Sequence, residues 1–229
     1  MRGCELMPSS RASRLEDYCD PDSAEHYDER WSGRRGRRRD ARKVAAIERA
    51  LGTLGLSGQD LTVLDAPAGT GRFRTLWSAG RHRVVGLDGS LAMLTVAQRR
   101  GWPGMLVAGD LGALPMRSVD VAVCIRFFHL VRDAEDRRHF LRELARVARV
   151  GVVIDVRHGL TLRGLGRAVR RGFGRLAGRA GPRRWPSPSE WVHEVESAGL
   201  QVVGSVPVRR PLWLSDKLLL ACRPGHVEP

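Results

Sequence analysis

Short apolar runs alternate with segments of helical character through the middle of the chain. The runs at residues 61–65, 83–88 and 118–125 are rich in valine, leucine and isoleucine, which is typical of buried strands. Their alternation with helical segments predicts one α/β domain, and 229 residues are ample for its core. Further apolar runs lie at 105–108 and 150–156, and helices are predicted at 42–51, 72–79, 91–100, 133–147 and 189–199.

The most informative run ends in Asp65 and leads directly into a turn that contains Gly69 and Gly71. Glycine permits a tight turn and a close approach of the backbone to a ligand, so this turn predicts a cofactor loop. A dinucleotide fingerprint that starts at Gly69 needs a small residue where Arg74 stands. A phosphate-binding P-loop needs a Lys-Ser or Lys-Thr pair after a glycine, and the chain has none. Both nucleotide-binding patterns are therefore excluded.

What remains resembles the first motif of the class I S-adenosylmethionine-dependent methyltransferases, usually D-x-G-x-G-x-G. Asp65, Gly69 and Gly71 match this motif, and Pro67 stands where the family more often has its first glycine. The fixed φ of proline suits the bend but removes one backbone N–H that could face a ligand. The resemblance implies that Asp65, Ala66, Gly69 and Gly71 line a site for S-adenosylmethionine.

Later landmarks of the same family follow in order. Asp88 ends the second strand, where the resemblance implies a carboxylate that accepts hydrogen bonds from the cofactor's ribose hydroxyls. Ser90 and Met93 resemble part of a G-x-D-x-S-x-x-M-L pattern; Ser90 is placed to cap a helix, and Met93 is expected against the adenine or in the core. Asp110 falls in a segment similar to the family's A-D-A-x-x-L-P pattern. The resemblance implies that its carboxylate contacts the adenine amino group. The implied cofactor-binding set is Asp65, Ala66, Gly69, Gly71, Asp88, Gly89, Met93, Asp110, Leu111 and Arg126.

The resemblance also implies a Rossmann-like, doubly wound sheet of seven strands with a terminal antiparallel hairpin, formed here by residues 201–206 and 216–222. Ligands bind outside the carboxyl ends of the strands in such a sheet, so Arg126 and His129 should border the cleft for methyl transfer. His129 is placed to act as a catalytic base on a hydroxyl acceptor, but a structural role fits it equally. Arg126 either holds an anionic acceptor or caps the cleft.

The organisation expected along the chain is an N-terminal extension over 1–40, a methyltransferase domain over 41–223 and a tail over 224–229. The first ~25 residues have the composition of a poorly ordered segment. Tyr27 and Trp31 follow, and this aromatic stretch either docks as an arm or covers the cofactor as a lid.

Localisation and redox state follow from two absences in the sequence. No apolar run approaches the ~20 residues of a membrane span, and the first residues lack the apolar core of a signal peptide, which favours a cytoplasmic protein. The four cysteines have no C-x-x-C spacing. The sequence therefore predicts neither a metal site nor a disulfide.

The formal net charge of +14 raises the question of a nucleic-acid partner. The excess lies in residues 30–43 and 160–184, which hold eight basic residues each and one acid between them. Nearly all of these are arginine, as a GC-rich coding bias would also produce, so the charge gives little support for phosphate contacts. The second segment has an amphipathic helical pattern weakened by glycines, and it is expected to be an acceptor lid, a membrane-surface contact or an ordinary packed helix.

The acceptor class follows from what the sequence lacks. It has neither the [DNS]-P-P-[FYW] segment of amino-group nucleic-acid methyltransferases nor the Pro-Cys pair that serves carbon methylation of pyrimidines. The sequence therefore favours methyl transfer to a small-molecule or lipid-like acceptor. Two alternatives stay open: an RNA methyltransferase that uses the two basic segments, and a noncatalytic cofactor-binding or scaffold protein.

Overall fold

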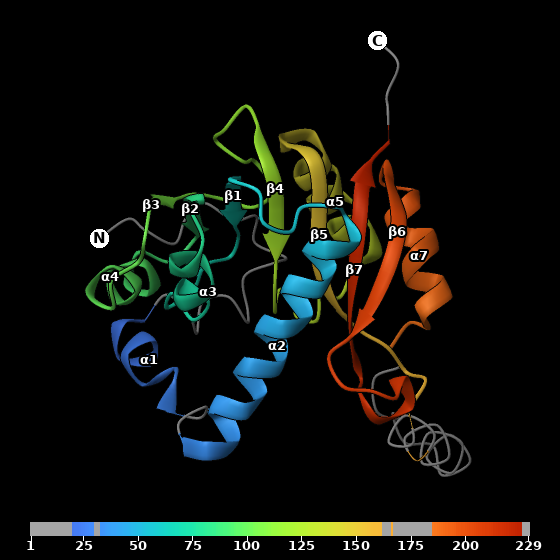
Figure 1. The fold of residues 1–229 in the computed structure, drawn as a ribbon, viewed down its shortest axis with the longest axis horizontal. Helices are drawn as coiled ribbons and strands as arrows, with labels where there is room; N and C mark the ends of the chain where they lie inside the picture. Colours follow the sequence, from blue (N-terminus) through green and yellow to red (C-terminus); the bar gives the residue numbers. More distant parts are fainter. Residues whose placement is uncertain (1–19, 30–32, 162–165, 167–184, 226–229) are drawn as a thin grey trace.

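The computed structural model describes residues 20–29, 33–161, 166 and 185–225, which form a seven-stranded sheet flanked by helices. The strands are β1 (Thr62–Asp65), β2 (Arg83–Asp88), β3 (Met105–Ala108), β4 (Val119–Cys124), β5 (Ala148–Arg157), β6 (Leu200–Pro207) and β7 (Lys217–Pro224). Their order is β3-β2-β1-β4-β5-β7-β6, and β7 lies antiparallel between β5 and β6 while β1 to β5 run parallel (Figure 1). This confirms the doubly wound sheet with a terminal antiparallel hairpin that the resemblance implies.

Helices cover both faces of this sheet. They are α1 (Pro21–His26), α2 (Gly33–Thr53), α3 (Arg74–Ala79), α4 (Leu91–Arg99), α5 (Ala134–Val147), α7 (Pro188–Glu196) and the 3-10 helix η4 (Leu212–Leu214). Val63 of β1 packs in the cluster under α2 and α3, whereas its neighbour Leu64 joins the cluster under α5 and α7. Successive side chains of a strand point to opposite faces, so a strand that is buried on both faces reads as a continuous apolar run.

Helix starts agree with the capping residues in the sequence. Ser90 precedes α4 and its hydroxyl accepts a hydrogen bond from the Met93 backbone N–H. Asp133 caps α5, and Ser187 caps α7 in a reciprocal capping box with Glu190. Each cap satisfies backbone donors that have no partner within the helix.

Helix α2 is longer than the sequence predicts, because it begins at Gly33 and not near residue 42. Arginine is a good helix former, and the buried positions Gly36, Lys43, Ala46, Ile47 and Ala50 recur at helical spacing. The basic run therefore belongs to an amphipathic helix and does not precede one. The boundary expected at residue 40 lies inside this helix.

A short helix also forms within the part of the chain expected to be poorly ordered. α1 begins directly after Asp20, whose carboxylate accepts a hydrogen bond from the Ser23 backbone N–H at 2.9 Å. Ala24 of α1 is buried against Met93 and Val96 of α4. This contact with the domain and the Asp20 cap together explain why residues 21–26 are helical.

Several expectations fall on residues that the structure does not describe. They concern Trp31, residues 1–19, most of the basic segment (162–165 and 167–184) and the last four residues. Among the helices that are described, none has both the length and the apolar character needed to cross a bilayer.

A buried ion pair joins α2 to the centre of the sheet. Lys43 Nζ lies 2.5 Å from Asp155 Oδ2 of β5, and both side chains are almost fully buried. Burying two charges costs desolvation free energy that their mutual attraction only partly offsets. The pair therefore fixes how α2 sits on the sheet more than it stabilises the fold.

We expect Lys43→Met to lower the free energy of unfolding by about 3–5 kcal/mol, because it leaves the Asp155 carboxylate buried without its cation. Urea denaturation of the single variants and of the double variant Lys43→Met/Asp155→Leu measures this. The double variant should recover most of the loss. A double variant that is as unstable as the sum of both single variants would contradict the assignment.

Candidate functional site

The glycine turn after β1 presents one open side and one closed side. Gly69 and Gly71 have φ values of +55° and +69°, which other residues rarely adopt. A Cβ at Gly71 would lie 3.1 Å from the Cβ of Ala97 in α4, so this glycine permits close packing of helix and loop. A Cβ at Gly69 would meet no described atom within 4 Å. The space for a ligand is therefore beside Gly69.

The Asp88 carboxylate at the end of β2 ties this turn to the start of α4. Its Oδ2 accepts a hydrogen bond from the Gly69 backbone N–H at 2.8 Å, and its Oδ1 accepts one from the Ser90 N–H at 2.9 Å. Burial raises the pKa of Asp88, while the N–H groups of Ser90 and Gly69 act in the opposite direction. The Gly89 N–H also acts on this carboxylate. A carboxylate has about four lone-pair sites, so these N–H groups leave capacity for a hydroxyl donor.

Asp65, at the end of β1, lies beneath the turn in a buried position. Trp77 of α3 donates its indole N–H to Asp65 Oδ2 at 2.7 Å, and Oδ1 is buried without a hydrogen-bond partner among the described residues. Burial, with a smaller contribution from the negative charge of Asp88, raises the pKa of Asp65 to about 7. A cation that arrived beside this carboxylate would offset its desolvation.

The remaining predicted cofactor residues lie around the same strand ends with different exposure. Asp110 follows β3, is half-buried, and accepts a hydrogen bond from the Gly112 N–H at 2.8 Å. Leu111 and Ala66 belong to the core cluster under α5, and Gly89 is half-buried beside Asp88. Met93 is in the small cluster with α1, which fits the core alternative of its prediction.

The segment after α1 closes over the turn through contacts that the sequence analysis missed. Thr70 donates its hydroxyl hydrogen to Asp28 Oδ2 at 2.8 Å, and Arg100 donates to the same oxygen. Arg72, next to the turn, forms a bidentate pair with Asp40 of α2. Figure 1 shows α1 and the first turns of α2 beyond the arrowhead of β4, at the carboxyl ends of the parallel strands. We call Asp28, Asp40, Thr70, Arg72 and Arg100 the clasp.

Arg126, two residues after the end of β4, contacts Tyr27 of the N-terminal segment. It is the non-glycine residue with positive φ among those described, at +68°, a strained conformation of the kind found at functional sites. Its guanidinium carbon lies 5.5 Å from the centre of the Tyr27 ring. Tyr27 thus covers this strand end, as both alternatives for the aromatic entry segment require.

His129 lies half-buried in a surrounding of positive charge. Burial, followed by the charge of Arg157, lowers the pKa of His129 to about 4. The imidazole is therefore neutral at physiological pH, and a base with so low a pKa removes a proton from a hydroxyl poorly. Its catalytic role stays a prediction. Among the described residues, no group of His, Cys, Asp and Glu side chains is arranged to hold a metal ion.

Comparison with known proteins shows what this chain is similar to. A family model described as a methyltransferase domain matches residues 64–154, the stretch from β1 into β5 that holds the turn, Asp88 and Asp110. This part of the chain is therefore similar to a methyltransferase domain. Malonyl-[acyl-carrier protein] O-methyltransferase of Serratia marcescens is 36% identical to it over 115 residues, which cover 48% of this chain and 45% of that protein. The chain thus spans less than half the length of the curated relatives it matches.

Solved structures share the fold over nearly the whole chain. Magnesium protoporphyrin IX methyltransferase of Synechocystis with bound S-adenosylhomocysteine has a TM-score of 0.67 at 19% identity and covers 91% of this chain and 97% of its own. The DhpI complex with S-adenosylhomocysteine has a TM-score of 0.65 at 25% identity and covers 94% and 97%. The fold, including the terminal hairpin, is therefore shared along its length.

We expect stability to reflect the raised pKa of Asp65. Because the folded-state pKa of about 7 exceeds the unfolded value of 3.8, the contribution of Asp65 is full below about pH 4 and is lost as pH rises to about 7. Asp65→Asn keeps an acceptor for Trp77 and does not titrate. Its free energy of unfolding should rise relative to the wild type by about 1.4 kcal/mol for each pKa unit of the shift. Urea denaturation at pH 4.5, 6 and 8 measures the difference, and a pH-independent difference would contradict the assignment.

The clasp should control how often the N-terminal segment opens. Asp28→Asn weakens two charged contacts and should speed amide hydrogen exchange in residues 21–29 severalfold or more. Glu25→Gln is the matched control, since it breaks an exposed pair with Arg99 of the kind that contributes about 0–1 kcal/mol. Equal exchange rates in the two variants would show that Asp28 does not hold the segment.

Proposed function

We propose that the chain is a methyltransferase that binds S-adenosylmethionine at the turn after β1 and transfers its methyl group to a small-molecule or lipid-like acceptor. The single observation that carries the proposal is the Asp88 carboxylate, held by Gly69 and Ser90 at the edge of the open space beside Gly69. That arrangement offers oxygen acceptors to ribose hydroxyls at the strand end where doubly wound sheets bind nucleosides.

The residues around the turn fit S-adenosylmethionine in three respects. The open side of Gly69 leaves room for a ligand against the backbone. The unpartnered Oδ1 of Asp65 suits a cofactor that carries positive charge. Asp110, at the end of the third strand in the same row, has a half-exposed carboxylate for the adenine amino group.

In this proposal, the chain's own residues hold the cofactor in place and enclose it. S-adenosylmethionine carries its methyl group on a positively charged sulfur, and so supplies both the electrophile and the leaving group. Asp88 and Asp110 would fix the nucleoside, while Tyr27 and the clasp close the N-terminal segment over the turn. Alignment of two bound reactants can by itself supply a large part of a rate enhancement. A base is therefore optional, in keeping with the low pKa of His129.

The acceptor class rests on the site and on the relatives together. The named activities of the similar proteins concern malonyl-[acyl-carrier protein] and magnesium protoporphyrin IX. In this chain, the basic run that suggested RNA contains Lys43, which is buried against Asp155, and Asp40, which pairs with Arg72. Part of that run therefore serves the fold, which weakens the support for an RNA acceptor.

We expect Asp88→Ala to weaken S-adenosylmethionine binding by about 1.5–3 kcal/mol, because hydrogen bonds to a charged acceptor are lost. Isothermal titration calorimetry of the folded variant measures the change. The variant should also lose stability, since the N–H groups of Gly69 and Ser90 lose their acceptor.

Asp120→Ala is the matched control for this experiment. Asp120 also accepts a hydrogen bond from a backbone N–H, that of Thr62 at 2.7 Å. It lies near the start of β4, at the end of the strand far from the turn. It should lose stability and keep its affinity for the methyl donor. Equal donor affinity in wild type and Asp88→Ala would reject the binding role of Asp88. Donor binding without transfer to any member of a broad acceptor panel would favour the noncatalytic alternative.

A further inference from the structure

Two cationic side chains face each other at the end of β5, on the face of the sheet that α2 covers. Arg157 of β5 and Lys217 of β7 are direct partners in the antiparallel pairing. Asp155 precedes Arg157 by two residues and so points to the same face, where it meets Lys43 of α2. Val153, two residues earlier still, packs in the core cluster under α2. We call Lys43, Asp155, Arg157 and Lys217 the β5 cluster.

The β5 cluster has an excess of positive charge. Its carboxylate is committed to Lys43, and among the described residues neither Arg157 nor Lys217 forms an ion pair. Residues 160–184, which follow β5 in the sequence, contain no acidic residue. Like charges placed directly opposite each other in a sheet are destabilising. Arg157 Cζ lies 5.6 Å from the centre of the Trp185 ring, but this neutral partner does not cancel the charge.

The surroundings of the cluster strengthen the imbalance. Burial, followed by the charge of Lys43, lowers the pKa of Lys217 to about 8. Asp155 and Asp216 act on Lys217 in the opposite direction, and Arg157 acts with Lys43. Positive charge that is partly withdrawn from water and not neutralised attracts anions strongly.

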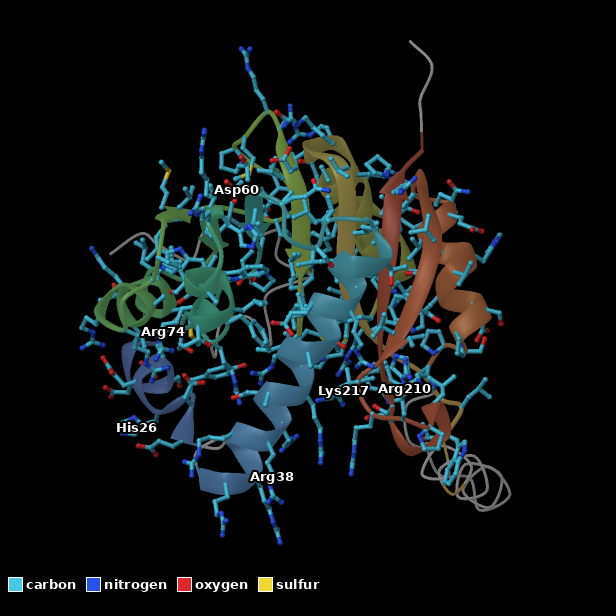
Figure 2. All side chains as sticks on the ribbon, viewed as in Figure 1. His26, Arg38, Asp60, Arg74, Arg210 and Lys217 are labelled. Atoms are coloured by element: carbon cyan, nitrogen blue, oxygen red, sulfur yellow. The ribbon has the colours of Figure 1, made fainter. Side chains whose placement is uncertain are left out.

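The cluster lies beside the site proposed for the methyl donor and is separate from it. Gly69, Asp88 and Asp110 lie at or just after the carboxyl ends of β1, β2 and β3. The β5 cluster lies at the same ends of the parallel strands, on the far side of β4. In Figure 2, Lys217 and Asp60 lie at opposite ends of the strands. Asp60 precedes β1 and so marks the amino ends of the parallel strands, whereas Lys217 lies at their carboxyl ends. The strand order therefore places the cluster where an acceptor would approach the donor.

We propose that Arg157 and Lys217 bind an oxyanion of the methyl acceptor, a carboxylate or a phosphate, and thereby select anionic acceptors over neutral ones. The identification of the bound anion as a methyl acceptor rests on the proposed function. The anion site itself does not depend on it. Arg157 presents a planar fork of donors and Lys217 an ammonium group, and together they match the two or more oxygens of such an anion. A bound anion would also offset the repulsion between the two cations.

The test uses the full chain and probes of matched shape. Hexanoate, hexyl phosphate and hexanamide share one alkyl skeleton and differ in charge, and calorimetry with and without S-adenosylhomocysteine gives their affinities. We expect one of the two anions to bind at least tenfold more tightly than the amide, with an affinity that falls as salt rises. The preference between hexanoate and hexyl phosphate identifies the oxyanion.

Variants at the two cations show whether they form the site. Lys217→Gln and Arg157→Gln should each weaken the preferred anion about tenfold or more, since a hydrogen bond to a charged group is lost. Arg223→Gln is the matched control, because Arg223 lies in the same strand as Lys217 but is exposed at the other end of that strand. Lys217→Gln should also keep or raise the melting temperature, because it removes a like-charge contact, whereas a residue with a purely structural role would lower it.

Each result decides for or against the anion site. Equal binding of charged and neutral probes, or an equal loss in Arg223→Gln, overturns it. If the methyl donor binds but neither anion binds more tightly than the amide, the proposed function stands and this inference is rejected. An anion preference that depends on Arg157 and Lys217, in a chain that binds no methyl donor, supports the anion site and rejects the proposed function instead.

Discussion

The structure of the site depends on one carboxylate at the end of β2. Asp88 accepts one hydrogen bond from the turn after β1 and one from the start of α4, so it joins three segments that are separate along the chain. A buried carboxylate is costly unless it is hydrogen-bonded, and these N–H groups are among the donors that turns and helix starts leave without partners. The same interaction therefore holds the loop in shape and places acceptor oxygens beside the open side of Gly69.

A second layer of charge surrounds this centre and closes it on the N-terminal side. Asp28 meets Thr70 and Arg100, while Asp40 meets Arg72, so the chain before β1 is held against the turn by carboxylates. Such contacts are strongest where water is excluded and are weak at exposed positions. The segment that lies over this turn is thus held by polar contacts together with a small apolar cluster that buries Ala24 against α4.

Positive charge in this protein has several separate uses. Lys43 is buried with Asp155 and sets the position of α2, whereas Arg126 stacks on Tyr27 at the end of β4. Arg157 and Lys217 remain without an acidic partner among the described residues. A net charge counted along the sequence cannot separate these uses, because the carboxylate that neutralises a given cation is chosen by folding. This is why the basic run at residues 30–43 suggested RNA when part of it is structural.

The sequence by itself determined the strand pattern, the glycine turn and the helix caps, because each depends on neighbouring residues. Continuous apolar runs are what strands buried on both faces require, positive φ requires Gly69 and Gly71, and Ser90 caps the helix it precedes. Tertiary structure alone decided the length of α2, the hydrogen bond from Trp77 to Asp65 and the pairing of Lys43 with Asp155. Lys43 and Asp155 lie 112 positions apart and no periodic pattern relates them, so only the packing of α2 against β5 brings their charges together.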